Sequence, residues 1–193
     1  MSAWPELLGP VEEVAPSLLG AVVRHGEVAV RLTEVEAYGG TSDAGSHAFR
    51  GPTPRSAIMF GPPGFLYCYL SYGMHVCANV VVGDEGTAAA VLLRAGEVVE
   101  GHAVARARRA GAGDRDLARG PALLCRALGI DLSHGGGDLA RGPVVLTLAG
   151  QARVPYTAGP RVGLRLESRR AWRFWAEGDP HVSVYRRHPK AET

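Results

Sequence analysis

The stretch VAVRLTEVEAY, from Val28 to Tyr38, decides the fold because its side chains repeat with a period of two. Alternate side chains of a strand point to the same face of a sheet. The residues that would share one face are Val28, Val30, Leu32, Glu34, Glu36 and Tyr38. The stretch therefore predicts a strand whose buried apolar face continues into two carboxylates and a tyrosine.

The two carboxylates allow two interpretations. A carboxylate on a buried face costs free energy unless it is paired or takes part in chemistry. Glu34 and Glu36 would lie roughly 7 Å apart along the strand, a separation that suits a water-mediated glycoside-type reaction. Equally, each carboxylate is solvated, or paired with an arginine such as Arg31 or Arg50. The residues alone leave both open, because general acid–base catalysis also needs a pocket.

The rest of the chain predicts an α+β fold around an antiparallel sheet. Residues 39–64, rich in Gly, Pro, Ser and Thr, predict a long ordered loop, and a loop of that length in a small domain is usually functional or disordered. Further strands are expected at 65–70, 74–82, 87–94, 144–148, 162–166 and 172–175, the first two forming a hairpin with Tyr72 near its tip. Helices are expected at 11–23, where Pro16 lies near an end or breaks the helix, at 101–110 and at 120–129. Strands, then helices, then more strands favour α+β.

Composition limits the class of protein. With 193 residues, 46% of them hydrophobic, the chain predicts a single domain over 1–193 with a polar tail at 184–193. No apolar run approaches the roughly 20 residues of a membrane helix, and the first segment carries Glu6 and Glu12 where a signal peptide has cations and an apolar core. We therefore expect a cytoplasmic protein without a membrane partner.

The cysteines and histidines predict no cofactor. Cys68, Cys77 and Cys125 are scattered, which argues against a disulfide framework or a thiolate metal site. No histidine spacing typical of a metal site occurs, and no GxGxxG follows a strand. We expect no metal and no dinucleotide.

Charge is distributed unevenly along the chain. Residues 1–101 hold 5 arginines and 11 acids, whereas residues 102–173 hold 13 arginines and 5 acids. Such a basic half is typical of a polyanion-binding face, although a charge run such as Arg106, Arg108 and Arg109 is also typical of a solvated helix face. Lys190, near the end of the tail, is the single lysine, which excludes a Schiff-base lysine in the core and a P-loop lysine.

Many spaced residues together resemble the alkyladenine (3-methyladenine, methylpurine) DNA glycosylase family, in the right order over nearly the whole chain. They are Glu34-Val-Glu-Ala-Tyr38, Asp43, His47, Gly51-Pro-Thr-Pro-Arg55, Met59-Phe60, Pro63-Gly64, Tyr67-Cys-Tyr69, Tyr72-Gly-Met74, Cys77, Asn79, Val91-Leu-Leu-Arg94, Arg119-Gly-Pro121, Leu128-Gly-Ile130, Pro160-Arg-Val-Gly163, Arg173-Phe174 and Val182-Ser183. Ser56 and Leu123 depart from the family, which more usually has asparagine at the first position and in some members lysine at the second. The resemblance implies a curved, open-barrel-like sheet flanked by helices, with a β-hairpin protruding at the DNA face.

The resemblance also implies a reaction and roles for single residues. Such enzymes flip a damaged purine out of duplex DNA and hydrolyse its N-glycosidic bond, leaving an abasic site; 3-methyladenine, and also ethenoadenine and hypoxanthine, are the expected bases. By this similarity Glu36 activates the water, while Arg94 and the backbone carbonyl of Val162 hold it. Glu34 would be a supporting or structural neighbour.

Further matches concern the base pocket and the DNA. Tyr38, His47 and Tyr69 match the aromatic walls and Asn79 a reader of the base edge, and aromatic faces would suit a cationic alkylated purine. Tyr72 matches the wedge that replaces the flipped nucleotide, with Met74 beside it. The arginines we expect at phosphates are Arg55, Arg115, Arg119 and Arg141.

The lysine count makes a mechanistic prediction without the family. A glycosylase that also nicks the strand needs an amine nucleophile, and only Lys190 and the N-terminus offer one. We therefore expect a monofunctional hydrolase, and the resemblance implies that it is a monomer acting on double-stranded DNA. A lesion-binding relative that does not cleave is the alternative, and a carbohydrate-active enzyme using Glu34 and Glu36 is a more distant one.

Overall fold

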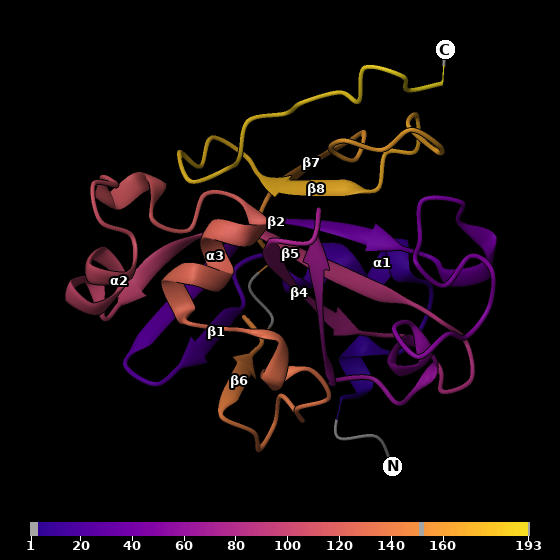
Figure 1. Ribbon diagram of the computed structural model, residues 1–193, viewed down its shortest axis with the longest axis horizontal. Helices are drawn as coiled ribbons and strands as arrows, with labels where there is room; N and C mark the ends of the chain where they lie inside the picture. Colours follow the sequence, from indigo (N-terminus) through magenta and orange to yellow (C-terminus); the bar gives the residue numbers. More distant parts are fainter. Residues whose placement is uncertain (1–3, 151–152, 193) are drawn as a thin grey trace.

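The computed structural model describes residues 4–150 and 153–192, and within them one antiparallel sheet of eight strands forms the centre of the molecule (Figure 1). The strands are β1 (Val22–His25), β2 (Val28–Tyr38), β3 (Leu66–Ser71), β4 (His75–Val81), β5 (Ala90–Glu100), β6 (Val144–Thr147), β7 (Tyr156–Gly159) and β8 (Arg173–Ala176). The strand order is β3-β4-β5-β2-β1-β6. The prediction of an α+β fold with an antiparallel sheet is confirmed.

The long strand β2 organises the sheet. One edge of β2 pairs with β5 along nearly its whole length. The other edge pairs first with β1, at Val28 to Arg31, and then with β8, at Glu34 to Glu36. Strand β7 extends the sheet beyond β8. Because three partners meet on β2, the segment near the C-terminus is brought against the two glutamates.

The helices are short. They are α1 (Val11–Val14), α2 (His102–Arg108) and α3 (Pro121–Leu128), with 3-10 turns at Pro5–Leu7, Ala15–Leu18, Gly40–Ser42, Ala57–Phe60, Asp114–Asp116 and Leu132–His134. Helix α3 begins with Pro121 in its first turn and ends before Gly129, whose φ of 75° is the left-handed conformation that favours glycine at a helix end. The sequence placed both α2 and α3 correctly.

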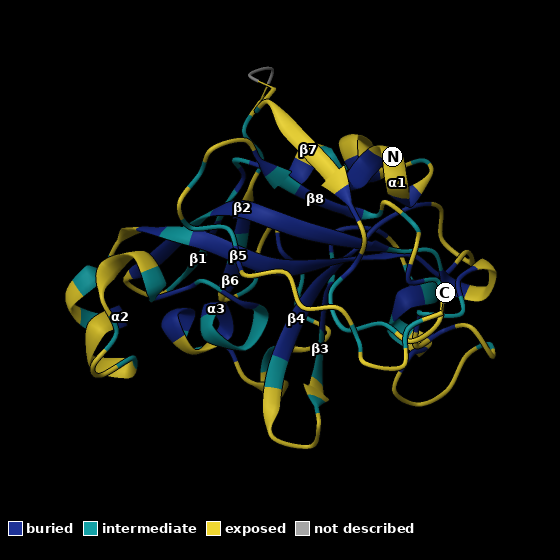
Figure 2. Ribbon diagram, turned by 90° about the horizontal axis from the view of Figure 1, so that it is seen from above, coloured by how far each residue is buried: buried dark blue, intermediate teal, exposed yellow. Residues whose placement is uncertain are grey.

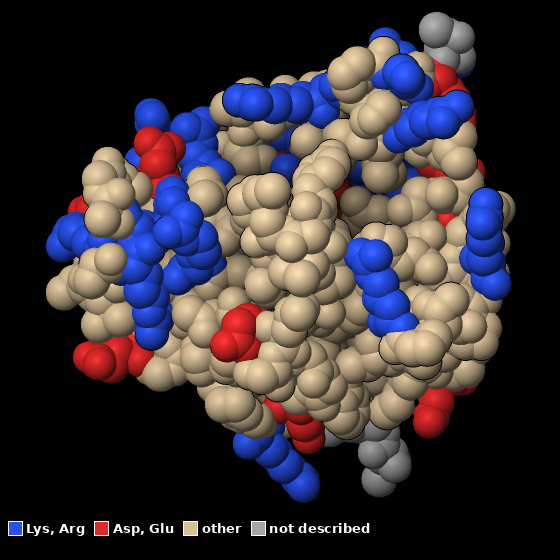
Figure 3. All heavy atoms as spheres, in the orientation of Figure 1, with Lys and Arg blue, Asp and Glu red and all other residues tan. Residues whose placement is uncertain are grey.

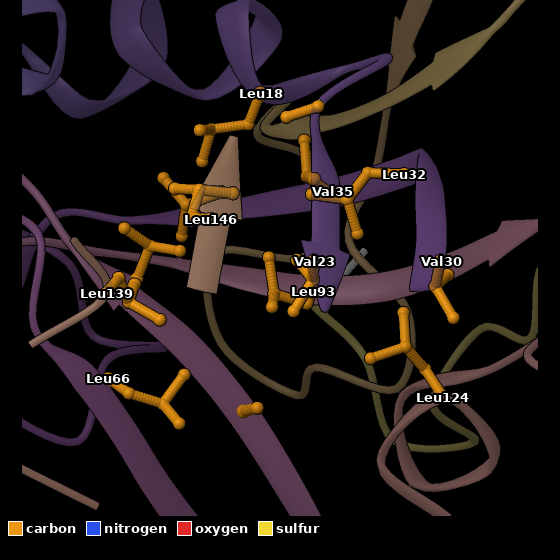
Figure 4. Close-up of a cluster of buried hydrophobic side chains, with 14 of the residues drawn as sticks. Leu18, Val23, Val30, Leu32, Val35, Leu66, Leu93, Leu124, Leu139 and Leu146 are labelled. Atoms are coloured by element: carbon orange, nitrogen blue, oxygen red, sulfur yellow. The ribbon is translucent and has the colours of Figure 1, made fainter. Parts of the chain in front are cut away.

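The main hydrophobic core joins the sheet to α3 and to the N-terminal turns (Figure 4). Leu124 of α3, Leu66 of β3 and Leu93 of β5 are all buried in it, as are Leu18 and Leu146. Burying a leucine or valine contributes roughly 1.5–3 kcal/mol. The core therefore holds α3 against the strands that carry the candidate site on their other face.

A β-bulge in β2 changes the face to which its side chains point. Leu32 pairs with Gly96 and Glu34 with Ala95, so Thr33 is an extra residue in the ladder. Before the bulge Val30 and Leu32 lie in the core; after it the core residue is Val35. The prediction that the apolar residues and the acids share one face is therefore wrong: the bulge turns Glu34, Glu36 and Tyr38 to the face opposite the valines.

Three further predictions differ from the structure. The α-helix predicted at 11–23 ends at Val14, because the chain changes to the 3-10 turn Ala15–Leu18 around Pro16, and Val22 and Val23 belong to β1. No strand forms at 162–166, where the chain turns; β7 lies just before it instead. Strand β5 continues past Arg94 to Glu100.

The β3–β4 hairpin projects from the body of the molecule (Figure 2). Figure 2 looks from above onto the view of Figure 1, so the hairpin points toward the viewer in Figures 1 and 3. Among the described residues no helix has the length and apolar character required to cross a membrane.

Candidate active site

The glutamates lie in a row of side chains that crosses the sheet. Glu36 pairs with Leu92 of β5, Leu92 with Asn79 of β4, and Asn79 with Tyr67 of β3. Paired residues of neighbouring strands point to the same face. The register therefore places the tyrosines of the hairpin and the carboxylate of Glu36 on one surface of the sheet, with Asn79 between them.

Glu36 is fully buried and accepts two hydrogen bonds, one from a residue of its own strand and one from the chain that follows β7. The Tyr38 hydroxyl donates to its Oε2 at 2.9 Å, and the amide N–H of Val162 donates to its Oε1 at 2.7 Å. Arg94 Nη1 lies 3.4 Å from Oε1. Burial, and next the Glu36 carboxylate, raise the pKa of Tyr38 well above its usual value, so the hydroxyl keeps the proton it donates.

A second bulge positions Arg94. Val35 pairs with Leu93 and Glu34 with Ala95, so Arg94 is the extra residue of β5. Bulges often redirect a side chain next to an active site, and this one directs the guanidinium toward both carboxylates. Burial by itself lowers the pKa of Arg94, but Glu36 and Glu34 raise it, and the balance is a higher pKa. The guanidinium remains charged.

Glu34 is enclosed by cations. Its Oε1 accepts from Arg94 Nε at 3.1 Å and from Arg173 Nε at 2.5 Å, and its Oε2 accepts from the Ser183 amide at 2.7 Å. All three partners are themselves buried. Glu34 thus has the surroundings of a structural carboxylate. Of the two interpretations of the sequence, pairing with arginine applies to Glu34. The partners are Arg94 and Arg173 and not Arg31 or Arg50.

Aromatic side chains line a pocket beside Glu36. It has a volume of about 90 Å³ and is lined by Tyr38, Gly45, Ser46, His47, Met59, Tyr67, Tyr69, Asn79, Ala90 and Leu164. The rings of His47 and Tyr69 meet edge to face with centroids 4.5 Å apart. Asn79 Nδ2 donates to the Tyr67 carbonyl at 3.0 Å, which fixes its amide. The structure brings together the four predicted base-pocket residues, Tyr38, His47, Tyr69 and Asn79.

A second hollow is lined by two residues that contact Glu36, Arg94 and Val162. Its volume is about 400 Å³, and its lining includes Arg94, Val162, Arg119 and Arg186. Arg94 and Val162 contact Glu36 from this hollow, whereas Tyr38 contacts it from the pocket. The carboxylate therefore lies between an aromatic pocket and a hollow with arginines at its rim.

Sequence reasoning gave no role to the ion pair that supports this arrangement. Arg161 and Asp43 are fully buried side chains, joined by two hydrogen bonds of 2.5 and 2.7 Å. Arg161 also donates to the Ala37 carbonyl at 2.9 Å, and its Cζ lies 4.7 Å from the centre of the Tyr38 ring. Since Arg161 precedes Val162, the pair fixes both donors to Glu36. Residues so far apart in the chain offer no spacing signal that could have linked them.

The hairpin tip carries the two residues predicted as a wedge. Tyr72 is 85% exposed and Met74 70% exposed. Tyr72 and Gly73 have φ values of 51° and 70°, the left-handed conformation of both central residues of a type I′ turn. A tyrosine rarely adopts this conformation. The turn holds a large aromatic side chain in solvent at the end of the hairpin.

The arginines predicted at phosphates lie in different places. Arg55 contacts the pocket wall, at His47 and Tyr69. Arg119 is held by the Val182 carbonyl and Asp116, while Arg115 pairs with Asp116. Arg141 lies exposed in the turn before β6. Sequence reasoning missed Arg186, which only the folded tail brings to the hollow.

The two departures from the family pattern are accommodated locally. Ser56 is buried and its hydroxyl accepts from the Thr53 amide and donates to the Gly51 carbonyl, which closes the loop. Leu123 lines the hollow beside Arg119. No group of three or more His, Cys, Asp or Glu side chains that could hold a metal ion occurs among the described residues.

Comparison with known proteins gives the family. The sequence model of methylpurine-DNA glycosylase (MPG) matches residues 6–180. A protein of Leifsonia xyli subsp. xyli named "Putative 3-methyladenine DNA glycosylase" is 55% identical over 190 residues, which cover 92% of this chain and 89% of that protein. Proteins of the same name from Nocardia farcinica and Frankia casuarinae are 53% and 52% identical, over 96% and 90% of this chain and 92% and 88% of those proteins. The chain therefore belongs to the methylpurine-DNA glycosylase family.

Proposed function

We propose that this chain binds a damaged purine, flipped out of duplex DNA, in the aromatic pocket and hydrolyses its N-glycosidic bond with a water activated by Glu36. Family membership makes the chain a DNA N-glycosylase of base-excision repair. The observation that carries the finer proposal is the position of Glu36, between the aromatic pocket and the hollow with arginines at its rim.

The chemistry of the bond explains this position. Cleavage builds positive, oxocarbenium-like charge on the deoxyribose. A flipped nucleotide with its base in the pocket would place its sugar near the Glu36 carboxylate, which can stabilise that charge and take a proton from the attacking water. Arg94 Nη1 lies 3.4 Å from Glu36 Oε1, and its guanidinium can hold the water there. The Val162 amide orients the carboxylate, and its carbonyl remains a predicted ligand of the water.

The exposed hairpin supports base flipping. Extruding a nucleotide leaves a gap in the stack, and glycosylases reach their target atom only after this step. Tyr72 has the exposure and the rigid turn that a wedge into the stack requires, with Met74 beside it. Figure 3 shows the face toward which the hairpin points, with Lys and Arg side chains gathered over α2 and along the C-terminal segment. We propose that this face meets the DNA.

The amine chemistry of the chain supports a monofunctional enzyme. Lys190 is in the C-terminal tail, and no lysine lies in the pocket or at Glu36. Without a lysine at the candidate site, no side-chain amine is placed there to form the Schiff base that strand cleavage requires. We propose that water is the nucleophile and that the product is an uncut abasic strand.

Duplex oligonucleotides that carry one hypoxanthine or one ethenoadenine, and methylated DNA, test the proposal. We expect the wild type to release the base and to leave a strand that breaks only after alkali. Glu36→Gln should bind the same duplex with similar affinity but release the base about 10²- to 10⁴-fold more slowly. Near-normal release by Glu36→Gln would refute the role of this carboxylate, and binding without any release by the wild type would indicate a non-cleaving lesion-binding protein.

A further inference from the structure

Arg55 lies against the outside of the base pocket. A groove of about 460 Å³ runs along the hairpin, and its lining includes Arg55, Ile58 and Leu132. Tyr67 and Tyr69 line both this groove and the base pocket, whereas Arg55 lines only the groove. The Tyr69 ring is therefore a wall between the two spaces, and the Arg55 Cζ lies 5.0 Å from its centre.

Arg55 also contacts a second wall of the pocket. Its Nη2 lies 3.2 Å from His47 Nε2. A guanidinium can only donate hydrogen bonds, so Nε2 accepts, and the ring proton of His47 lies on Nδ1, which donates to the Tyr67 hydroxyl at 3.0 Å. His47 keeps part of its surface exposed, but its pKa is lowered to about 4. The larger cause is desolvation of the ring by burial, and the second is the positive charge of Arg55. His47 is thus a neutral wall at physiological pH.

The charge of Arg55 is not offset by an acid. Arg161 stacks on Tyr38 in a similar way, but Asp43 neutralises it in a buried pair. Within residues 4–150 and 153–192, no carboxylate forms an ion pair with Arg55, whose contacts are aromatic. The pocket therefore has one uncompensated positive charge, placed one ring away from any base that stacks on Tyr69.

We propose that Arg55 is a specificity-determining residue that biases the base pocket toward neutral damaged purines and against cationic ones. This inference rests on the proposed function. Purines methylated on a ring nitrogen, such as 7-methylguanine, carry positive charge in the nucleotide, whereas hypoxanthine is neutral. A cation on the inner face of Tyr69 would be attracted by the ring but repelled by the guanidinium on the outer face. A neutral base stacks there without this repulsion.

Base release from two duplexes that differ only in the lesion tests the proposal. The measured quantity is the ratio of kcat/KM for 7-methylguanine to kcat/KM for hypoxanthine. We expect Arg55→Gln to raise this ratio by about tenfold over the wild type, while Arg55→Lys, which keeps the charge, stays within about twofold. The matched control is Arg24→Gln, which removes the same charge from β1, separated from the hairpin by β5 and β2, and should leave the ratio unchanged.

The outcomes separate this inference from the proposed function. An Arg55→Gln enzyme that loses rate equally on both lesions would overturn the inference and identify Arg55 as a phosphate ligand. A wild type that releases neither base would overturn the proposed function, and the inference with it. As a readout without activity, NMR titration of the His47 ring should give a higher pKa in Arg55→Gln than the wild-type value of about 4; an unchanged pKa would show that the guanidinium does not act on the pocket.

Discussion

Glu34 and Glu36, two positions apart on β2, have the same side chain but different surroundings, so they can play different chemical roles. Glu34 accepts hydrogen bonds from Arg94, Arg173 and a backbone amide, so cations occupy its oxygens. Glu36 accepts from an amide and from the neutral hydroxyl of Tyr38, a residue that lines the pocket, and the Arg94 guanidinium lies 3.4 Å from its Oε1. Environment commonly assigns different roles to paired carboxylates. The structure therefore favours Glu36 as the base and Glu34 as the residue that anchors Arg94.

Replacing Glu34 should cost mainly stability. Glu34→Gln leaves Arg173 buried without its carboxylate and Arg94 with Glu36 alone, and breaking a buried ion pair in this way costs about 3–5 kcal/mol. Glu97→Gln is the matched control, because its pair with Arg31 is partly exposed and should contribute less than about 1 kcal/mol. Urea denaturation measures both free energies of unfolding. Similar values for the two variants would contradict a structural role for Glu34.

The buried pair of Asp43 and Arg161 should make stability depend on acid. Burial by itself raises the pKa of Asp43, but the hydrogen bonds and charge of Arg161 lower it, and the net pKa lies below the usual value. A carboxyl with a depressed folded-state pKa contributes stability that is present above its unfolded pKa of about 3.9 and is lost as the pH falls below it. In urea titrations, Asp43→Asn should therefore be destabilised at pH 7 and lose less further stability than the wild type between about pH 4 and pH 2. The exposed Asp84→Asn should follow the wild-type curve.

At the scale of the elements, two bulges determine which side chains the sheet directs to the candidate active site. Thr33 is the extra residue of β2 and Arg94 that of β5, both next to Glu34. A bulge adds one residue to one strand and reverses the facing of everything that follows. For this reason β2 contributes Val30 and Leu32 to the core and Glu36 to the opposite face. One strand thus serves both the core and the candidate active site.

At the tip of the hairpin between β3 and β4, we expect Tyr72 to lower the stability of the fold while it raises the affinity for lesion DNA. Tyr72 has a φ of 51°, which costs a residue other than glycine about 1–2 kcal/mol. Tyr72→Asn would create Asn-Gly, a preferred type I′ turn. We expect this variant to unfold at the same or a higher temperature while its affinity for lesion DNA falls about tenfold or more. Tyr156→Asn, on exposed β7, is the control; full lesion affinity in Tyr72→Asn would exclude the wedge.

At the scale of the whole molecule, the uneven charge of the sequence becomes a surface property. The basic half of the chain supplies α2 and the segment through Arg161 and Arg173, and Lys and Arg side chains lie on the hairpin face at several places (Figure 3). Several of these cations are used internally: Arg161 and Arg173 are buried, and Arg106 pairs with Asp114. Net charge alone therefore overstates the number of arginines available to DNA.

DNA affinity should depend on salt in a way that identifies the phosphate ligands. Each phosphate neutralised by an arginine contributes about −0.9 to the slope of log K against log salt concentration. Arg186, at the rim of the hollow beside Glu36, is a candidate ligand, so Arg186→Gln should make the slope shallower by about 0.9. Fluorescence anisotropy with a lesion duplex measures this. Arg24→Gln should keep the wild-type slope, and an identical effect of both variants would mean that only total charge matters.

Much of the fold and of the candidate site could be predicted because the signals are local. The alternation in β2 predicted that Glu34, Glu36 and Tyr38 share a face, and the turn at Tyr72-Gly73 predicted the hairpin; both relations hold. The family resemblance named the residues that the structure gathers around Glu36. Local periodicity and spacing depend only on neighbouring residues, so they can be read without a structure.

The sequence by itself thus determined the strand, the hairpin, the family and the absence of lysine from the pocket, since each depends on residue type and short-range order. The tertiary structure decided the face on which the acids lie, because a bulge results from register with β5 and leaves no mark in the period of β2. It also decided the partners of the carboxylates, Arg94, Arg173 and the Val162 amide, and the pair of Asp43 with Arg161. Contacts between residues 60 to 149 positions apart form only when packing of the whole chain brings them together, and these contacts distinguish Glu36 from Glu34.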